Sequence, residues 1–253
     1  MENADQSTVE KTAKKKFQIK NLLTATNILM MVFVLLYLLD CYLPLPDGYT
    51  GYTAWYSETP PAFNYIFGNC GGLLTNYLAM GKTLTPHTNA VYRHITMMFL
   101  HGGLLHLTAN LVGFYFIGNY AEKRFGWWMM LIVFFLTGFI ESYTTDPLYA
   151  ALFPKQAAEI SNNVSLGASG GIFGLMGFSL AAIFFDIKSF KQIKKPTLIV
   201  SVIYGIFVTY VVGLGWGTLC HNVALLIGLV IGTLIILPFY FLKKGKFAPE
   251  KTE

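Results

Sequence analysis

Six long stretches of apolar residues run along the chain, and polar or glycine- and proline-containing segments separate them. A helix of about 20 apolar residues crosses the hydrocarbon core of a bilayer, so stretches near this length predict membrane spans. We expect an all-α membrane protein with a bundle of six transmembrane helices, which cover 21–39, 104–120, 127–143, 170–185, 197–213 and 219–242. This organisation makes 1–20 an N-terminal tail, 21–242 the membrane domain and 243–253 a C-terminal tail.

Composition and charge also indicate a membrane protein. Of the 253 residues, 54% are hydrophobic and only 12% are charged, whereas soluble domains carry about 25% charged residues. All of the 18 Lys and Arg residues except Lys82, Arg93 and Lys155 fall on one side of the predicted membrane. The positive-inside rule therefore places both termini in the cytoplasm. We interpret the net charge of +5 as basic anchors for anionic lipid, which argues against nucleic acid as a partner.

Polar residues in three of the spans are the candidates for chemistry, because buried polar groups in lipid are costly and tend to be functional. The second span opens with HGGLLHLTAN, in which His106 and Asn110 lie four residues apart and share a helix face. Ser169 precedes the fourth span within GASGG, and His221 opens the sixth. Small residues follow at helical spacing, namely Gly170, Gly174, Gly177 and Ala181 in the fourth span and Ala224, Gly228 and Gly232 in the sixth. Such stripes predict that these two helices pack backbone to backbone.

This arrangement suits hydrolysis by a serine nucleophile. A serine hydroxyl needs a base within hydrogen-bond reach, and His221 can take that role for Ser169. The helix that starts after Ser169 directs free backbone N–H groups toward the reacting centre, and His106 and Asn110 can add donors to the same oxyanion. Each feature alone has a plain structural reading, since helix-start serines are usually caps and intramembrane histidines usually bond a neighbouring helix. Their conjunction at one membrane depth favours the catalytic interpretation.

From residue 92 to residue 232 the chain resembles the rhomboid family of intramembrane serine proteases. The likeness is carried by the YR pair in the outer loop, by HGGLLHLTAN, which fits the pattern HxxxxHxxxN, and by GNYAEKRFG, which fits GxxxExRxG. GASG fits the serine motif of the family, and His221 with Gly228 fits its last-span histidine motif. The order, spacing and span placement of these motifs all agree with the family.

The resemblance implies a serine-type endopeptidase that cuts the transmembrane helices of membrane-protein substrates in or near their outer ends. Ser169 would be the nucleophile and His221 the general base, in a dyad without an acid. His106, Asn110 and the backbone N–H of Ser169 would stabilise the oxyanion, and no cofactor or metal is expected. The resemblance implies structural roles for His101, for Arg93 as an anchor of the outer loop, and for Glu122 and Arg124 as a pair at the cytoplasmic end of the second span.

Two other interpretations stay open on the sequence. A catalytically inactive relative that binds membrane proteins would lose the serine or the histidine, and both are present. A transporter or metal carrier that uses His101, His106 and His221 would show internal repeats or a second cluster of metal ligands, and the sequence has neither. We interpret Glu141, near the outer end of the third span, as an interfacial hydrogen bonder, with a third catalytic member or a proton relay as alternatives.

Three further expectations concern the cysteines, the fifth span and the location. Cys41, Cys70 and Cys220 are odd in number and form no CxxC pair, so all three are expected to be free thiols with packing roles. The span at 197–213 is bulky and β-branched, and it is therefore expected to pack loosely enough to tilt as a gate for substrates. The short polar tails, with no extra domain, favour a bacterial plasma membrane.

Overall fold

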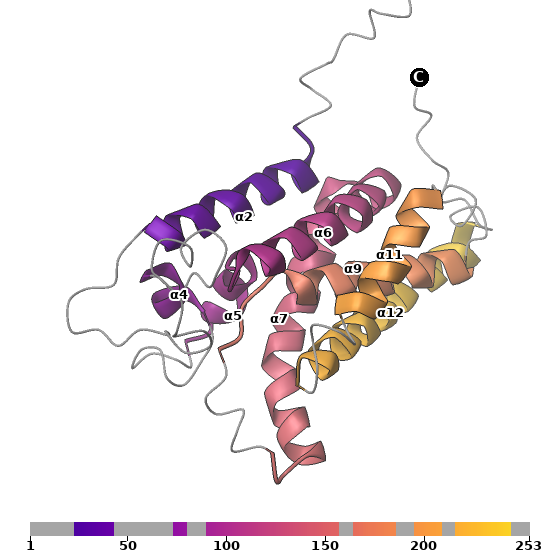
Figure 1. Cartoon of the computed structure of the whole chain (residues 1–253). Helices are drawn as coiled ribbons and strands as arrows, with labels where there is room; N and C mark the ends of the chain where they lie inside the picture. The colour runs from indigo at the N-terminus through magenta and orange to yellow at the C-terminus, as the bar shows by residue number, and fades with distance from the viewer. Residues whose placement is uncertain are drawn as a thin grey trace, which may run out of the picture.

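The computed structural model describes residues 23–42, 73–79, 90–156, 164–185, 195–208 and 216–243, and these residues form an all-α bundle. The long helices in this part of the chain are α2 (Ala25–Tyr42), α6 (Leu104–Phe125), α7 (Trp127–Leu152), α9 (Ser169–Phe185), α11 (Lys195–Phe207) and α12 (Trp216–Lys243). Within the described residues, three short elements precede α6, namely α4 (Leu73–Leu78), α5 (Arg93–Thr96) and the 3₁₀ helix η2 (Met97–Phe99). In Figure 1, α2 lies along one side of the bundle beside α6, and α11 lies on another side, where it also packs against α6.

Each predicted span overlaps one long helix, although several boundaries differ. α7 continues to Leu152, well past the predicted end at 143. Its last turns are more polar, and the hydroxyls of Thr144 and Thr145 donate to backbone carbonyl oxygens one turn earlier. α11 ends at Phe207, and residues 209–213 of the predicted fifth span lie outside the described residues. The N-terminal tail, 1–20, and residues 244–253 of the C-terminal tail also lie outside them.

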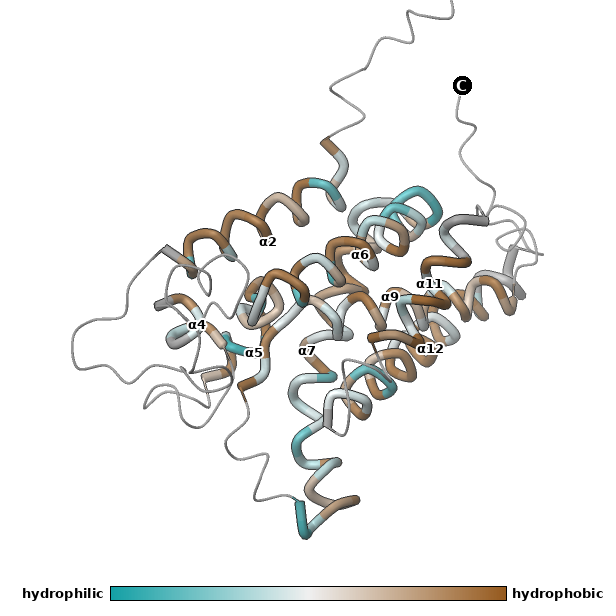
Figure 2. The backbone as a smooth tube through the Cα atoms, in the orientation of Figure 1, coloured by the Kyte–Doolittle hydropathy of each residue, from teal (hydrophilic) through white to brown (hydrophobic). Residues whose placement is uncertain are grey.

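Length and composition identify which described helices can cross a membrane. Within the described ranges, Trp127–Leu152 and Gly217–Pro238 each meet this test, and a third crossing follows if Arg93–Phe99 and Leu104–Phe125, bent by 94°, are counted as one span. Ala25–Cys41 and Ser169–Phe185 are apolar but shorter. Figure 2 shows α2 and α11 mostly in the brown of hydrophobic residues. The prediction of an all-α membrane protein is confirmed, whereas the six-span count and the cytoplasmic termini stay predictions.

α2 joins the bundle through aromatic packing against α6 and α7. The rings of Phe33, Phe114 and Phe134 are fully buried. Their centroids lie 5.9 Å apart for Phe33 and Phe114, 6.3 Å for Phe33 and Phe134, and 5.1 Å for Phe114 and Phe134. Buried aromatic pairs at such separations contribute favourable contacts beyond their buried area. The first predicted span is therefore an integral part of the core.

α9 is the central helix, and its small residues allow two neighbours to approach closely. A Cβ added at Gly177 would overlap the backbone of α12 at Leu225, as the predicted stripe requires. A Cβ added at Gly170 would meet Glu141 of α7 at 2.7 Å, and one at Gly174 would overlap Thr137 of α7. The stripe on α9, which was predicted to pack against the sixth span, therefore also lies against α7 at Gly170 and Gly174.

The contacts between α9 and α12 also fix their relative direction. A Cβ added at Gly228 would overlap the carbonyl oxygen of Gly174, and one at Gly232 would lie 2.8 Å from the Cβ of Ala181. Both helices thus advance in the same direction along their contact. The prediction that they pack backbone to backbone is confirmed at these positions, and both helices begin at the same end of the bundle.

We expect Gly228→Ala to destabilise the protein because the added methyl group would overlap a backbone oxygen of α9, which cannot move without displacing the helix. Overpacking of this kind costs about 1–3 kcal/mol of unfolding free energy. The measurement is thermal unfolding in detergent, followed by tryptophan fluorescence. Gly217→Ala in the same helix is the matched control, since no described atom lies within 4 Å of a Cβ at that position. Equal melting temperatures for the two variants would contradict the tight α9–α12 contact.

Candidate active site

Ser169 is the first residue of α9 and follows a sharp turn of the backbone. Gly167 has φ of +123°, which a residue with a side chain rarely adopts, and its N–H donates to the carbonyl oxygen of Met97 at 2.9 Å. The turn ends at Ala168, whose carbonyl accepts the N–H of Ile172 at 3.0 Å and so begins the helix. The Ser169 side chain is partly exposed. The local sequence therefore places an accessible hydroxyl at the start of a helix, where backbone N–H groups have no partner inside the helix.

His221 lies in the second turn of α12, close to the start of α9. Its ring stacks on Phe173 with a centroid separation of 4.5 Å and an interplanar angle of 12°. Phe173 is four residues after Ser169, so both side chains lie on the same face of α9. Helical rise puts Ser169 about 8 Å and His221 about 10 Å above the contact between Gly174 and Gly228. The structure thus brings the predicted nucleophile and base to the same end of one helix pair.

His106 and Asn110 of α6 face the turn that precedes Ser169. A Cβ at Gly167 would lie 2.7 Å from both Cε1 and Nε2 of His106, and 3.8 Å from Nδ2 of Asn110. Asn110 is 1% exposed, and its Oδ1 accepts a hydrogen bond of 3.0 Å from the hydroxyl of Tyr204 on α11. Its Nδ2 is buried and has no hydrogen-bond partner among the described residues. Both predicted oxyanion donors therefore lie against the turn at Gly167 that precedes Ser169.

Two of the predicted structural residues, Arg93 and His101, are buried. Arg93 is 1% exposed, and its Nη1 donates to the carbonyl oxygen of Ala79 at 2.9 Å, which ties α5 to the end of α4. His101 is 1% exposed, with its ring 5.4 Å from that of Phe33 and 5.3 Å from that of His106. These contacts support the structural interpretation of both residues.

Glu122 has a contact that the sequence did not suggest. Its carboxylate accepts the backbone N–H groups of Ala25 and Thr26 at 2.9 and 2.8 Å and the hydroxyl of Thr26 at 2.6 Å. A carboxylate at a helix N-terminus satisfies free N–H groups and interacts favourably with the helix dipole. Arg124, its predicted partner, has its guanidinium carbon 5.4 Å from the ring centroid of Phe125. Glu122 therefore has a structural role as the N-terminal cap of α2.

Glu141 forms hydrogen bonds at the junction of α7, α9 and α12. The carboxyl group is 4% exposed and accepts from the hydroxyl of Thr145 at 3.1 Å. It also pairs with the thiol of Cys220 on α12 and faces Gly170 on α9. This is the interfacial hydrogen bonding expected from the sequence. It links Gly170, which follows Ser169, to Cys220, which precedes His221.

The cysteines differ from the expectation of three free thiols. Cys41 is disulfide-bonded, so the prediction is wrong for this residue. Cys220 is free and buried, as expected. Cys70 lies outside the described residues. An odd number of cysteines with no CxxC pair does not exclude a disulfide, because bridged cysteines can lie far apart in sequence and meet only in the fold.

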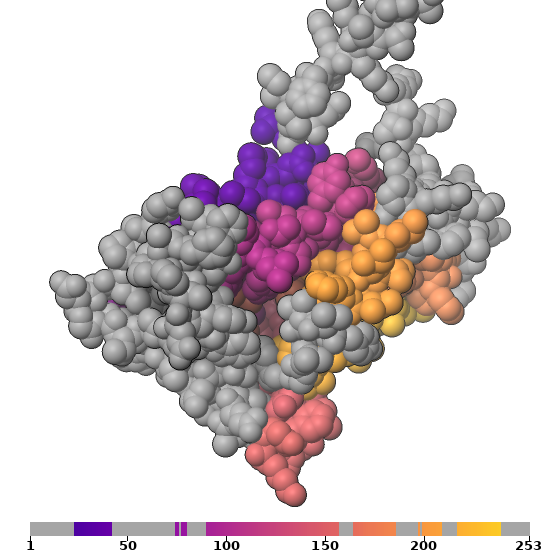
Figure 3. All heavy atoms as spheres, in the orientation of Figure 1, coloured from indigo at the N-terminus to yellow at the C-terminus, as the bar shows by residue number. Residues whose placement is uncertain are grey.

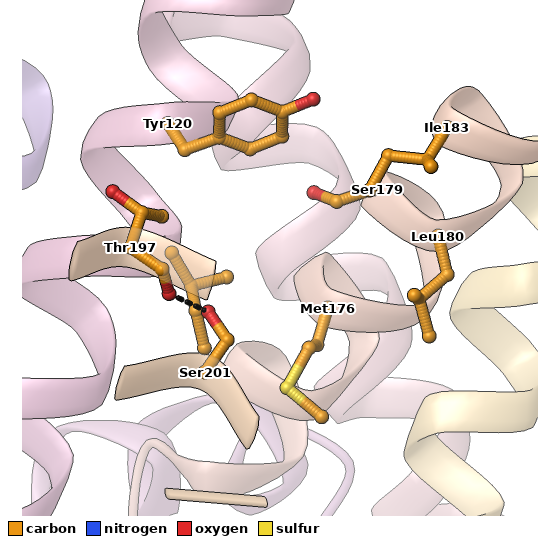
Figure 4. A pocket seen from close by; sticks show the side chains of 8 residues that line it. Tyr120, Met176, Ser179, Leu180, Ile183, Thr197 and Ser201 are labelled. Carbon is orange, nitrogen blue, oxygen red and sulfur yellow. Dashed lines mark hydrogen bonds between the residues drawn. The ribbon is translucent and has the colours of Figure 1, made fainter. Parts of the chain in front are cut away.

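A pocket between α6, α9 and α11 lies at the opposite end of α9 from Ser169. Figure 4 shows side chains of these three helices around it, including Tyr120, Ser179 and Thr197. The only hydrogen bond drawn there, from the Ser201 hydroxyl to the Thr197 carbonyl at 2.7 Å, lies within α11. The lining is almost entirely apolar. The pocket separates part of α11 from α9 and contains none of the predicted site residues.

Sequence reasoning missed two residues of the site. Phe173 stacks on His221, and its spacing of four residues from Ser169 was a usable signal. Tyr204 bonds Asn110 from 94 positions away, and nothing in the local sequence of α11 distinguishes this tyrosine from an ordinary lipid-facing ring. The site residues come from α6, α9, α11 and α12, which only the fold brings together.

Comparison with known proteins gives a consistent picture. A family model described as "Rhomboid domain" matches residues 88–240, more than half of the chain. RHOMBOID-like protein 7 of Arabidopsis thaliana is 32% identical over 142 residues, which cover 56% of this chain and 39% of the relative. Inactive RHOMBOID-like protein 8 of the same plant is 31% identical over 133 residues, 52% of this chain and 34% of the relative. Rhomboid-type serine protease 2 of Emericella nidulans is 28% identical over 153 residues, 60% of this chain and 28% of the relative. The chain thus spans well under half the length of these relatives.

Proposed function

The chain belongs to the rhomboid family, and from this premise we propose that it is a serine endopeptidase that cleaves membrane-protein substrates in or near the outer ends of their transmembrane helices. The observation that carries the proposal is the convergence of four side chains at one end of the bundle. Ser169 starts α9, His221 stacks on Phe173 four residues further along that helix, and His106 and Asn110 face the turn before the serine. A nucleophile, a base and two oxyanion donors in one place support acyl transfer.

In the proposed reaction, the Ser169 oxygen attacks the carbonyl carbon of the scissile peptide bond, and the imidazole of His221 takes the hydroxyl proton. The carbonyl oxygen becomes an oxyanion, which accepts hydrogen bonds from Asn110 Nδ2, from His106 and from the backbone N–H of Ser169. His221 then gives the proton to the leaving amine as the C–N bond breaks. Water, deprotonated by His221, attacks the acyl-enzyme ester, and proton return from His221 to the Ser169 oxygen releases the carboxylic acid product.

The proposed orientation puts both termini in the cytoplasm and the starts of α9 and α12 toward the outer side. The distribution of Lys and Arg supports it. The disulfide at Cys41, near the end of α2, also supports it, because disulfides persist in oxidising compartments outside the cytosol. The relatives described above come from Arabidopsis thaliana and Emericella nidulans, and neither organism supports the expected bacterial plasma membrane. The protein is membrane-embedded.

A second candidate is an inactive member that binds membrane proteins without cleaving them. One relative with 31% identity is named inactive, so membership of the family alone does not make this chain a protease. The presence of both Ser169 and His221 favours the active protein, since loss of either residue would remove the nucleophile or the base. Labelling of the serine separates the two candidates.

We expect a fluorescent phosphonate to label the purified protein in detergent at Ser169, because only a serine activated by a nearby base attacks such a reagent rapidly. Ser169→Ala should remove the label. Ser201→Ala is the matched control and should keep it, since the Ser201 hydroxyl bonds its own helix. In-gel fluorescence with mass-spectrometric site mapping measures both. A folded wild-type protein that stays unlabelled would favour the inactive alternative.

A further inference from the structure

The side chain of Asn110 has two different environments at its two ends. Its Oδ1 accepts the Tyr204 hydroxyl at 3.0 Å, and both residues are buried, with 1% and 5% exposure. Its Nδ2 is buried without a hydrogen-bond partner among the described residues and faces Gly167. A buried amide donor without a partner is costly unless another group uses it. The hydrogen bond to Oδ1 thus leaves the donor end of the amide, Nδ2, free beside the turn that precedes Ser169.

Tyr204 is itself held firmly by its surroundings. A Cβ at Gly113 of α6 would lie 2.6 Å from the Tyr204 ring, so the absence of a side chain there admits the ring. The ring centroid also lies 5.5 Å from that of Phe173, which stacks on His221. Tyr204 therefore contacts Asn110, the predicted oxyanion donor, directly. It contacts His221, the predicted base, through the ring of Phe173.

We propose that Tyr204 is a positioning residue of the hydrolytic site, whose hydroxyl fixes the Asn110 amide with Nδ2 directed at the oxyanion and whose ring supports Phe173 against His221. This inference rests on the proposed function of Ser169 and His221. An amide is nearly symmetric in shape, so only its hydrogen bonds decide which end points at the substrate. Without the Tyr204 hydroxyl, Oδ1 loses its donor and the amide has no preference for the productive orientation.

The helix that carries Tyr204, α11, lies at the edge of the bundle. α11 lies at the surface of the face shown in Figure 3, next to α6, and Ile203 and Ile206 on either side of Tyr204 are 61% and 57% exposed. The apolar pocket also separates part of α11 from α9. The oxyanion donor is therefore oriented by the helix at the edge of the bundle. The amide is set for catalysis only while that helix is seated on α6.

The test is Tyr204→Phe, which keeps the ring packing and removes only the hydroxyl. We expect kcat for a membrane-embedded substrate to fall by about tenfold, the effect of one hydrogen bond, with KM little changed. In an Asn110→Ala background the same substitution should cause no further loss of kcat, since the amide that it orients is gone. Ser201→Ala, which removes a hydroxyl bonded within α11, is the matched control and should keep the wild-type kcat.

Three outcomes would overturn the inference. If Tyr204→Phe turns over substrate like the wild type, the hydroxyl has no positioning role. If the loss of kcat in Tyr204→Phe multiplies with the loss in Asn110→Ala, and Tyr204→Phe also lowers the melting temperature, Tyr204 has a structural role only. Ser169-dependent cleavage by the wild type would in that case still support the proposed function. If the folded wild type shows no Ser169-dependent cleavage, the proposed function fails and this inference fails with it.

Discussion

Ser169→Ala and His221→Ala are each expected to abolish cleavage of a transmembrane-helix substrate, with a loss in kcat on the order of 10⁴–10⁶. The alanine at 169 removes the attacking oxygen, and the alanine at 221 removes the group that accepts its proton. Because the two side chains act as one unit, the double variant should be no slower than either single variant. Turnover by purified protein in lipid vesicles measures all three variants.

The control for this experiment is a serine–histidine pair elsewhere in the protein. His94 Nδ1 lies 2.5 Å from the Ser142 hydroxyl, between α5 and α7, where neither residue contacts the candidate site. Ser142→Ala should therefore keep the wild-type turnover. Appreciable cleavage by Ser169→Ala would exclude the serine mechanism. Losses that simply multiply in the double variant would show that Ser169 and His221 act separately.

Asn110→Ala is expected to lower kcat on the order of 10²–10³ while KM stays near the wild-type value, because an oxyanion donor acts on the transition state more than on the bound substrate. The free Nδ2 beside Gly167 is the structural basis of this expectation. Steady-state kinetics of the purified variant with a membrane-embedded substrate separates kcat from KM.

Asn119→Ala is the matched control, since Asn119 lies on the same helix and its Nδ2 donates to the carbonyl oxygen of Tyr115 at 2.7 Å on an exposed face. This variant should keep its rate. Asn110→Ala with unchanged kcat would remove the residue from the site. A rate loss in proportion to a lower melting temperature would instead mark Asn110 as a structural residue that satisfies the Tyr204 hydroxyl.

The sequence alone determined the helices and most of the residues of the candidate site. Apolar stretches near the length of a membrane span predicted the six regions in which the long helices α2, α6, α7, α9, α11 and α12 lie, because a chain in lipid must satisfy its backbone hydrogen bonds internally. The glycine and serine pattern predicted the start of α9 at Ser169 to within one residue. The spacing of His106 and Asn110 predicted their shared face, which follows from helix geometry.

Only the tertiary structure decided which helix faces meet and which distant groups bond. The stripe of small residues on α9 proved to serve α7 as well as α12, since glycine spacing shows that close approach is possible without identifying the neighbour. Glu122 caps α2 from 96 to 97 positions away, and Tyr204 bonds Asn110 from 94 positions away. Such contacts depend on how whole helices are placed against one another. Local periodicity predicts the face of each helix that is buried, whereas packing in three dimensions selects the partner on that face.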